Sequence, residues 1–145
     1  FQLFDLNATR TETIQNRPAR STAFKTAIRA LYGNDCCVCR MAVVHPNGRK
    51  SEMEAAHVVP RSRQGSDDSR NGLGFCRRDH WAFDQGLFGV DDHNEIIVPD
   101  SVLAIPANDA HLSPLVGQPI WQPPVTPVAP EALRWHRDHV LLKDS

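Results

Sequence analysis

The placement of proline constrains this chain more than any other feature. Eight of its eleven prolines fall between residues 99 and 130, in a chain of 145 residues. Because proline lacks a backbone N–H, it is excluded from helix interiors and central strands. This stretch therefore predicts an extended strap that crosses the surface. Pro130 suits the first turn of a final helix, which we expect over residues 131–142.

Apolar spacing and turn residues predict the elements before the strap. One apolar face at helical spacing predicts a first helix, with Ser21 as its N-cap and Gly33 as its C-terminal stop. Turn residues at 45–48 and 91–94 each lie between β-prone runs, which predicts two hairpins. The expected elements are a helix at 21–32, a hairpin of 37–44 with 52–59, a helix at 77–86, and a second hairpin of 87–90 with 95–98.

We therefore expect one α+β domain with flanking segments. Residues 1–19 read as an arm or interdomain linker, residues 20–98 as the core, and residues 99–145 as the strap and a C-terminal helix that packs on the core. No apolar stretch is long enough to span a bilayer. The chain begins with Phe1, and no basic-then-apolar leader follows, so we expect a fragment of a longer protein.

Charge is distributed unevenly along the chain. Residues 1–80 carry 13 Lys and Arg against 8 Asp and Glu, whereas residues 81–145 carry 3 against 9. A basic half joined to an acidic half gives a directional field that a polyanion would sense. Chance clustering of surface charges explains it equally well, so the asymmetry is weak support for a nucleic-acid partner.

The cysteines indicate reduced thiols. Three of the four lie in the run Cys36-Cys37-Val38-Cys39. Adjacent cysteines are poor disulfide partners, and a Cys-x-x-Cys pair without a secretory leader favours a metal site or free thiols. We therefore expect a cytoplasmic protein.

Three short motifs carry the chemistry. Residues 54–60 read Glu-Ala-Ala-His-Val-Val-Pro, residues 71–73 Asn-Gly-Leu, and residues 79–86 Asp-His-Trp-Ala-Phe-Asp-Gln-Gly. Together they resemble the HNH endonucleases, also called ββα-metal or His-Me finger nucleases, and in particular the subgroup with the motifs A-A-H-I-x-P, N-G-L and H-x-x-F-D-x-G. The resemblance covers residues 21–98. It implies a small ββα-metal core with an N-terminal helix, a second small hairpin, the strap and the C-terminal helix.

The resemblance implies a role for each motif. His57 would be the general base, because a histidine with a pKa near neutrality can take a proton from water. His80 and Asp84 lie one helical turn apart and would hold one divalent cation, Mg, Mn, Ni or Zn. Asn71 would either orient His57 or contact the metal. Considered one at a time, these residues have ordinary interpretations: His57 as a core histidine, Asp84 as a carboxylate at a helix end, and Asn71 as part of an Asn-Gly turn.

One position departs from the family pattern. Many relatives carry an acidic or histidine ligand just before the base, where this chain has Ala56. Glu54 lies on the same face of the strand by alternation and could compensate. Because of this departure, weak metal binding and a catalytically inactive family member both remain alternatives.

The cysteines match a second metal site of zinc-containing relatives. The resemblance implies a structural zinc at Cys36, Cys39, Cys76 and Asp79. A Cys₃Asp shell is less usual than Cys₄ or Cys₃His, so Cys37 or His45 remain alternatives for the fourth ligand. Small buried thiols without metal are the competing interpretation.

Arginines surround the motifs and are candidates for DNA phosphate contacts, since such contacts position a protein without reading sequence. Solvated surface charge is the alternative. The candidates are Arg61, Arg63, Arg70, Arg77 and Arg78.

These observations predict a metal-dependent endonuclease domain that hydrolyses double-stranded DNA, within a larger restriction or defence enzyme of a bacterial or phage-infected cell. Sequence or modification specificity is expected in a recognition domain outside this chain. Because a single site cuts one strand, a double-strand break would need two protomers, as in a homodimer, or two events. The alternatives are a silent zinc-bound DNA-binding or interaction module and a toxin-type non-specific nuclease.

Overall fold

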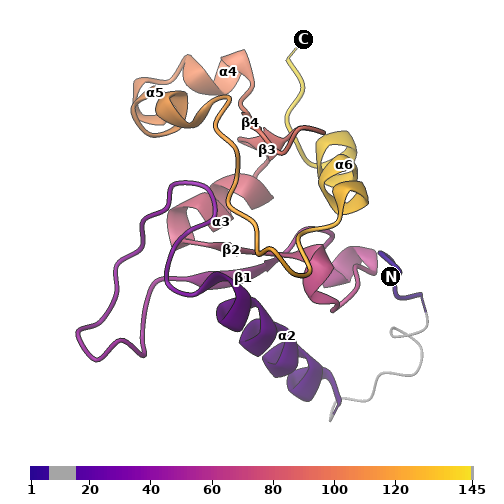
Figure 1. Ribbon diagram of the computed structural model, residues 1–145. Coiled ribbons are helices and arrows are strands. Elements are labelled where there is room, and N and C mark those ends of the chain that lie inside the picture. The colour runs from indigo at the N-terminus through magenta and orange to yellow at the C-terminus, as the bar shows by residue number, and fades with distance from the viewer. Residues whose placement is uncertain (7–15, 145) are drawn as a thin grey trace.

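A short antiparallel hairpin lies between two helices in the computed structural model, which describes residues 1–6 and 16–144 (Figure 1). None of the described helices is both long and apolar enough to cross a membrane. In chain order the elements are α2 (Asn16–Tyr32), β1 (Glu54–His57), η1 (Arg61–Arg63), η2 (Ser69–Asn71), β2 (Gly72–Phe75), α3 (Arg77–Asp84), β3 (Gly89–Val90), β4 (Ile96–Ile97), α4 (Asp100–Leu103), α5 (Pro106–Leu112), η3 (Ser113–Leu115) and α6 (Pro130–His139).

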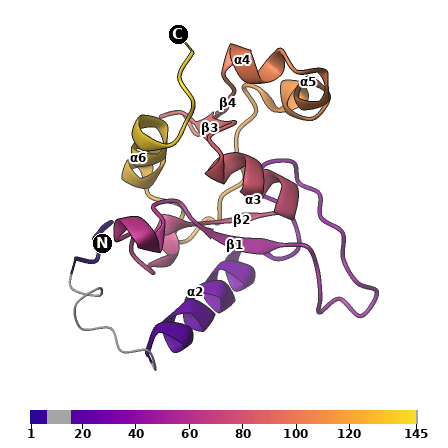
Figure 2. The same ribbon diagram turned by 180° about the vertical axis from the view of Figure 1, so that it is seen from behind.

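Helix α2 packs closely on one face of the β1–β2 hairpin (Figure 2). It presents Phe24, Ile28 and Tyr32, all buried and spaced for one helical face. The approach requires glycine in β2. A Cβ on Gly72 would lie 2.4 Å from Ile28 Cδ1, and one on Gly74 would lie 2.5 Å from Tyr32 Cβ. The glycine of the Asn-Gly-Leu motif is thus explained by the contact between helix and strand.

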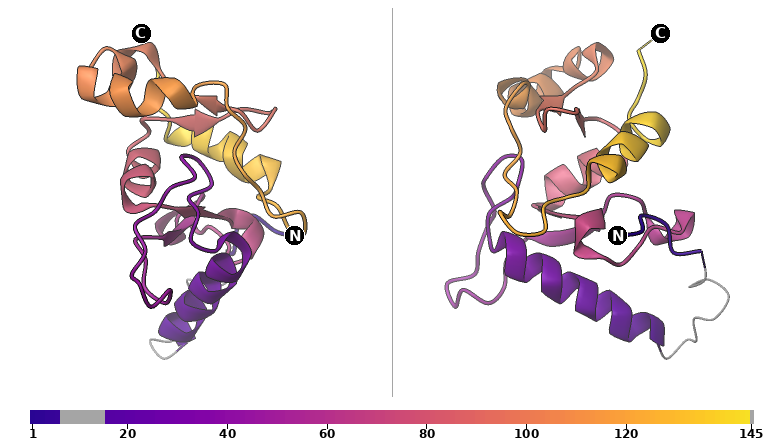
Figure 3. Two further views of the ribbon diagram at one scale, coloured as in Figure 1. Left: turned by 60° about the vertical axis from the view of Figure 1, so that its left-hand side comes forward. Right: turned by 45° about the vertical axis from the view of Figure 1, so that its right-hand side comes forward.

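Helix α3 covers the other side of the hairpin, where aromatic side chains form the core. Phe75, Phe83 and Phe88 are fully buried, and their ring centroids lie 5.1–6.1 Å apart. Beyond them come the β3–β4 hairpin and helices α4, α5 and α6, at the end of the molecule away from α2 (Figure 3). Two histidines from this side contact α3: His111 of α5 lies beside Asp79, and His136 of α6 lies beside the carbonyl of Phe83.

The first predicted hairpin is correct at its turn, where the N–H of Gly48 donates to the carbonyl of His45, but wrong in its strands. Residues 37–44 form no strand; Val44 makes one isolated bridge with Ser51, and β1 pairs with β2, with His57 opposite Gly72. The chain turns at the cysteines instead: the backbone N–H of Arg40 donates to the carbonyl of Cys36, and Arg40 has φ of 64°. This turn directs the thiols toward α3, which a strand could not do.

Two other expectations need correction. Helix α2 begins at Asn16, so Ser21 lies inside it and is not the N-cap; Pro18 falls in the first turn, where proline is tolerated. The expected strap is helical over much of its first half, because Pro106 and Pro114 sit in the first turns of α5 and η3. Residues 7–15 of the expected arm lie outside the described part.

The remaining elements agree with the sequence-based expectations. Helix α3, the β3–β4 hairpin and α6 form at the predicted places, and α6 has proline in its first turn. Gly33 ends α2 with φ of 64°, as expected of a C-terminal stop. The fold class is confirmed as α+β with two small hairpins.

Candidate active site and metal cluster

His57 is the last residue of β1 and its imidazole is held on two sides. Its ring stacks on Phe24 of α2 with centroids 3.7 Å apart, and Nε2 lies 2.8 Å from Oδ1 of Asp67. Burial lowers the pKa of His57 below its ordinary value, and the bond to Asp67 opposes that shift without cancelling it. The imidazole is therefore neutral at pH 7, with its orientation fixed.

Asn71 holds the loop that carries Asp67. It is fully buried, and its side-chain oxygen accepts from the backbone N–H of Val59 at 2.9 Å. Its NH₂ donates to the carbonyls of Val59 and Ser66, at 2.9 and 2.8 Å. The amide thus ties the end of β1 to the loop beside it. Of the two roles expected for Asn71, this geometry favours orientation over metal contact.

His80 lies between two carboxylates on the facing helix. Its Nδ1 is 2.9 Å from Oε1 of Glu54, and its Nε2 is 3.2 Å from Oδ2 of Asp84. The bond to Asp84, followed by that to Glu54, raises the pKa of His80 against the effect of burial. Glu54 therefore orients the ring through Nδ1, and Nε2 lies beside the Asp84 carboxylate.

His57 and the His80–Asp84 pair open on one cleft of about 440 Å³. Had the imidazole of His57 packed away from the other two, they could not act on one phosphate. Ala56 is fully buried in the core and offers no ligand. The cleft is lined by Ala55, His57, Val58, Pro60, Arg61, His80, Asp84, His136 and Val140.

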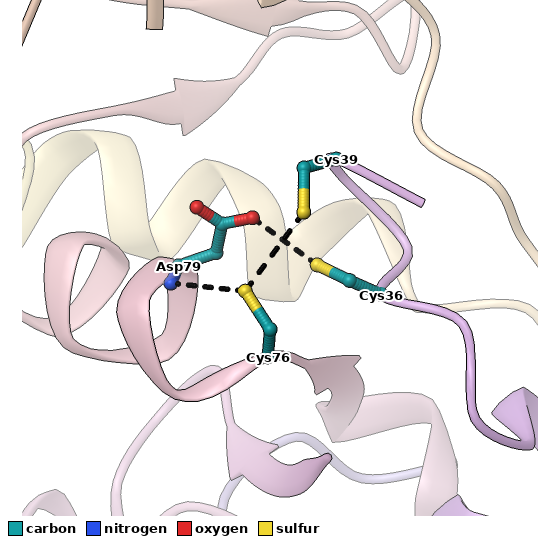
Figure 4. A group of neighbouring side chains, drawn as sticks. All are labelled: Cys36, Cys39, Cys76 and Asp79. Atoms are coloured by element: carbon teal, nitrogen blue, oxygen red, sulfur yellow. Dashed lines mark hydrogen bonds between the residues drawn. The ribbon is translucent and has the colours of Figure 1, made fainter. Parts of the chain in front are cut away.

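The cysteines and Asp79 form a second cluster (Figure 4). Cys36 and Cys39 come from the turn after α2, while Cys76 and Asp79 come from the start of α3, and all four side chains point toward one another. Their ligand atoms lie within 4.8 Å of one another. Hydrogen bonds from Cys39 and Cys76 lower the pKa of the Cys36 thiol, which favours a thiolate. Three soft sulfurs and one carboxylate are a donor set that suits zinc.

His111 of α5 completes this cluster from outside. Its Nε2 lies 2.7 Å from Oδ1 of Asp79, while Oδ2 of the same carboxylate lies 3.2 Å from Sγ of Cys36. Asp79 is fully buried. A buried carboxylate needs such partners, and this one leaves a single oxygen facing the thiols.

The comparisons with known proteins address the family. Residues 36–91 match the family model described as HNH endonuclease. A solved structure, the "Modification dependent TagI restriction endonuclease", is similar with a TM-score of 0.66 and 23% identity, over 86% of this chain and 40% of that one. No curated protein matches.

The family-model match agrees with the resemblance expected from the motifs over residues 36–91, and the structural similarity supports the fold. The chain spans 40% of the length of the solved restriction endonuclease. The matched HNH segment contains His57, His80 and Asp84 of the cleft and all four residues of the cysteine cluster, but not His111.

The alternative zinc ligands lie outside the cluster. Cys37 is buried without contributing to the four-atom group, and burial raises the pKa of its thiol. His45 is exposed on the loop that follows. Among the described residues, Cys36, Cys39, Cys76 and Asp79 therefore form a group of four side chains placed to share one metal ion.

The arginines predicted for phosphate contact differ in their surroundings. Arg61 lines the cleft but lies 3.8 Å from a carboxylate oxygen of Asp67. Arg70 pairs with its near neighbour Asp68 at 2.9 Å. Arg63 lies over the ring of Trp135, Arg77 lies 3.4 Å from Glu54, and Arg78 is exposed.

Sequence reasoning missed Asp67 and His111. Asp67 lies in a polar loop next to Asp68, and no pattern distinguishes the two carboxylates. His111 lies in the proline-rich region, outside every motif. Neither had a signal in the sequence that could have found it.

Proposed function

We propose that this chain is the metal-dependent DNA endonuclease part of a larger restriction or defence enzyme. The observation that carries the proposal is the shared cleft, in which a neutral, oriented His57 faces the His80–Asp84 pair. A phosphodiester hydrolase needs a base for water on one side of the phosphate and charge stabilisation on the other.

His57 would accept the proton of the attacking water. Its Nε2 is engaged by Asp67 at 2.8 Å, so the tautomer with hydrogen on Nε2 leaves the Nδ1 lone pair for the proton. Asp67 then stabilises the imidazolium that forms. The stacking of Phe24 on the ring limits its rotation, which keeps Nδ1 at one place.

His80 and Asp84 would hold the divalent cation. The cation would supply stabilisation of the negative charge on the phosphate and on the leaving oxygen. Glu54 would compensate for the ligand missing at position 56 without binding the cation itself. It would accept a hydrogen bond from Nδ1 of His80 and thereby direct Nε2 toward the cation beside Asp84. Mg, Mn, Ni and Zn all remain candidates, because imidazole and carboxylate accept each of them.

The second cluster would hold a structural zinc through Cys36, Cys39, Cys76 and Asp79. It joins the turn after α2 to the start of α3, the helix that carries His80. His111 would orient the carboxylate, as partners of metal ligands do. The site would stabilise a small core at the base of the catalytic helix.

Two alternatives have specific consequences. The lack of a ligand at Ala56 favours a silent zinc-bound module that binds DNA without cutting it. A toxin-type nuclease would cut structured RNA or any DNA. The solved restriction endonuclease is described as modification dependent. By analogy, we expect a recognition domain in the rest of the protein, and two protomers for a double-strand break.

The test is nicking of supercoiled plasmid by the purified chain with Mg²⁺, Mn²⁺, Ni²⁺ or Zn²⁺. We expect cation-dependent nicking that falls on the order of 100-fold or more in His57→Ala. Equal nicking by both proteins would exclude His57 as the base. Binding without nicking under every cation would favour the silent module, and preference for structured RNA would favour the toxin-type nuclease.

A further inference from the structure

Basic side chains border the cleft on two sides and differ in how far their charge is neutralised. On the loop side, Arg61 lies 3.8 Å from carboxylate oxygens of both Asp5 and Asp67. Arg70 donates two side-chain hydrogen bonds to Asp68, each of 2.9 Å. These arginines already have carboxylate partners, so a phosphate there would compete with them.

On the other side, beneath α2, a groove of about 350 Å³ adjoins the cleft. The two cavities share Ala55 and His80 in their walls, so a bound chain could pass from one to the other without leaving the surface. The groove is lined by Lys25, Arg29, Met53, Glu54, Ala55 and His80.

The two cations of this groove have no carboxylate partner among the described residues. Lys25 makes no side-chain hydrogen bond there, and Arg29 donates to the carbonyl oxygen of Arg49 at 3.3 Å. The acid in the groove, Glu54, is already engaged by His80 at 2.9 Å and Arg77 at 3.4 Å. The sequence of α2 contains no Asp or Glu. The groove therefore carries uncompensated positive charge.

The position of these cations is fixed relative to the candidate base. Lys25 and Arg29 lie four residues apart, on one side of α2 and about 6 Å apart along its axis. Their neighbours Phe24 and Ile28 are buried against the hairpin, and the Phe24 ring stacks on His57. A phosphate held by Lys25 and Arg29 would thus stand at a set place relative to the cleft.

We propose that Lys25 and Arg29 form a binding site for DNA backbone phosphates adjacent to the phosphate that is cut. The inference rests on the proposed nuclease function and adds a direction to it: the DNA strand leaves the cleft along α2. Contacts of this kind give affinity and register without sequence preference.

The test is duplex binding in the His57→Ala background, without added divalent cation, measured by fluorescence anisotropy over a range of salt. Each lost phosphate contact reduces the slope of log K against log[salt] by about 0.9. We expect Lys25→Gln/Arg29→Gln to reduce the slope by about 2 and to weaken binding on the order of 10-fold near physiological salt. Lys25→Arg should retain the slope. Lys143→Gln, at the exposed C-terminal end, is the matched control and should change neither value.

A plasmid-nicking assay of the same substitutions with His57 intact separates the two proposals. If the unmodified chain nicks DNA while Lys25→Gln/Arg29→Gln leaves affinity, salt slope and nicking unchanged, the phosphate site is wrong and the nuclease function stands. If the unmodified chain neither nicks nor binds DNA under any cation, the proposed function fails and this inference fails with it. Thermal unfolding of each variant shows whether the fold is retained.

Discussion

Replacing Asp67 with asparagine tests the chemistry of the base most directly. Asparagine keeps the size of the side chain and an oxygen that accepts a hydrogen bond, but it removes the negative charge. Oδ1 of Asp67 lies 2.8 Å from Nε2 of His57. If His57 takes a proton from water, as proposed, an imidazolium forms beside this carboxylate and the hydrogen bond then joins two charged groups.

The expected loss of kcat follows from the strength of this hydrogen bond. A hydrogen bond to a charged group contributes about 1.5–3 kcal/mol, and about 1.4 kcal/mol of barrier is tenfold in rate. We therefore expect Asp67→Asn to reduce kcat by about 10- to 100-fold. Asp67 opposes the lowering of the His57 pKa by burial. Without the charge that pKa should fall further.

The assay is single-turnover plasmid nicking at saturating enzyme and cation, from about pH 5 to pH 9. The rate rises with pH as His57 loses its proton, so in Asp67→Asn this rising limb should move to lower pH while the plateau falls. Asp68→Asn is the matched control, because Asp68 pairs with Arg70 and not with His57. A plateau within twofold of the unmodified chain, with the limb in place, would refute the role of Asp67.

Three further predictions concern the metal cluster and the core. Cys36→Ser should abolish bound zinc in the purified protein, and His111→Ala should weaken zinc about 10- to 100-fold in a chelator competition; a folded protein without zinc would contradict the cluster. Burial lowers the pKa of His136 to about 4, whereas in the unfolded chain the pKa is about 6.5. Between these two pH values the unfolded chain binds a proton and the folded chain does not. The free energy of unfolding should therefore fall by about 3 kcal/mol as the pH is lowered through this range. Denaturant titrations should show this loss, and His136→Phe should lack it; equal pH dependence in both would exclude His136 as the cause. Gly74→Ala should destabilise the fold by about 1–3 kcal/mol, because its Cβ would meet Tyr32 Cβ at 2.5 Å, whereas Gly89→Ala, which meets a Leu141 methyl at 3.3 Å, should cost less.

The elements that the sequence predicted correctly are those with local signals. Helix α3 and the β3–β4 hairpin follow from nearby apolar and turn residues, and α6 follows from its proline and its apolar spacing. The pairing of β1 was missed because its partner lies beyond a polar loop, while the run at residues 37–44 is closer and equally β-prone. The pairing of these distant strands depends on their packing with α2, and the sequence of a strand alone does not reveal which helix it packs against.

The residues of the candidate site also divide into those that a sequence motif predicts and those whose contacts only the structure gives. His57, Asn71, His80 and Asp84 could be predicted because their motifs match a family as a set. Glu54 was noticed as a substitute ligand, but its bond to His80 could not be deduced, since strand alternation says which face a residue takes and not which atom it contacts. The phosphate contacts were expected on the loop because arginines are dense there, yet the same loop holds Asp67 and Asp68, whose carboxylates pair with them.

The surroundings of the two histidines in the cleft fit the two different roles proposed for them. His57 is paired with one carboxylate and is buried enough that its pKa is lowered, so it is neutral at pH 7 and able to accept a proton. His80 lies between Asp84 and Glu54, which raise its pKa because they stabilise a positive charge at that place. The same pair of acids that favours a proton on His80 would also favour the divalent cation proposed for this place. Opposite shifts of neighbouring groups are how one site separates a base from a charge-binding element, and exchanging the two roles would put the base where a proton is held tightly.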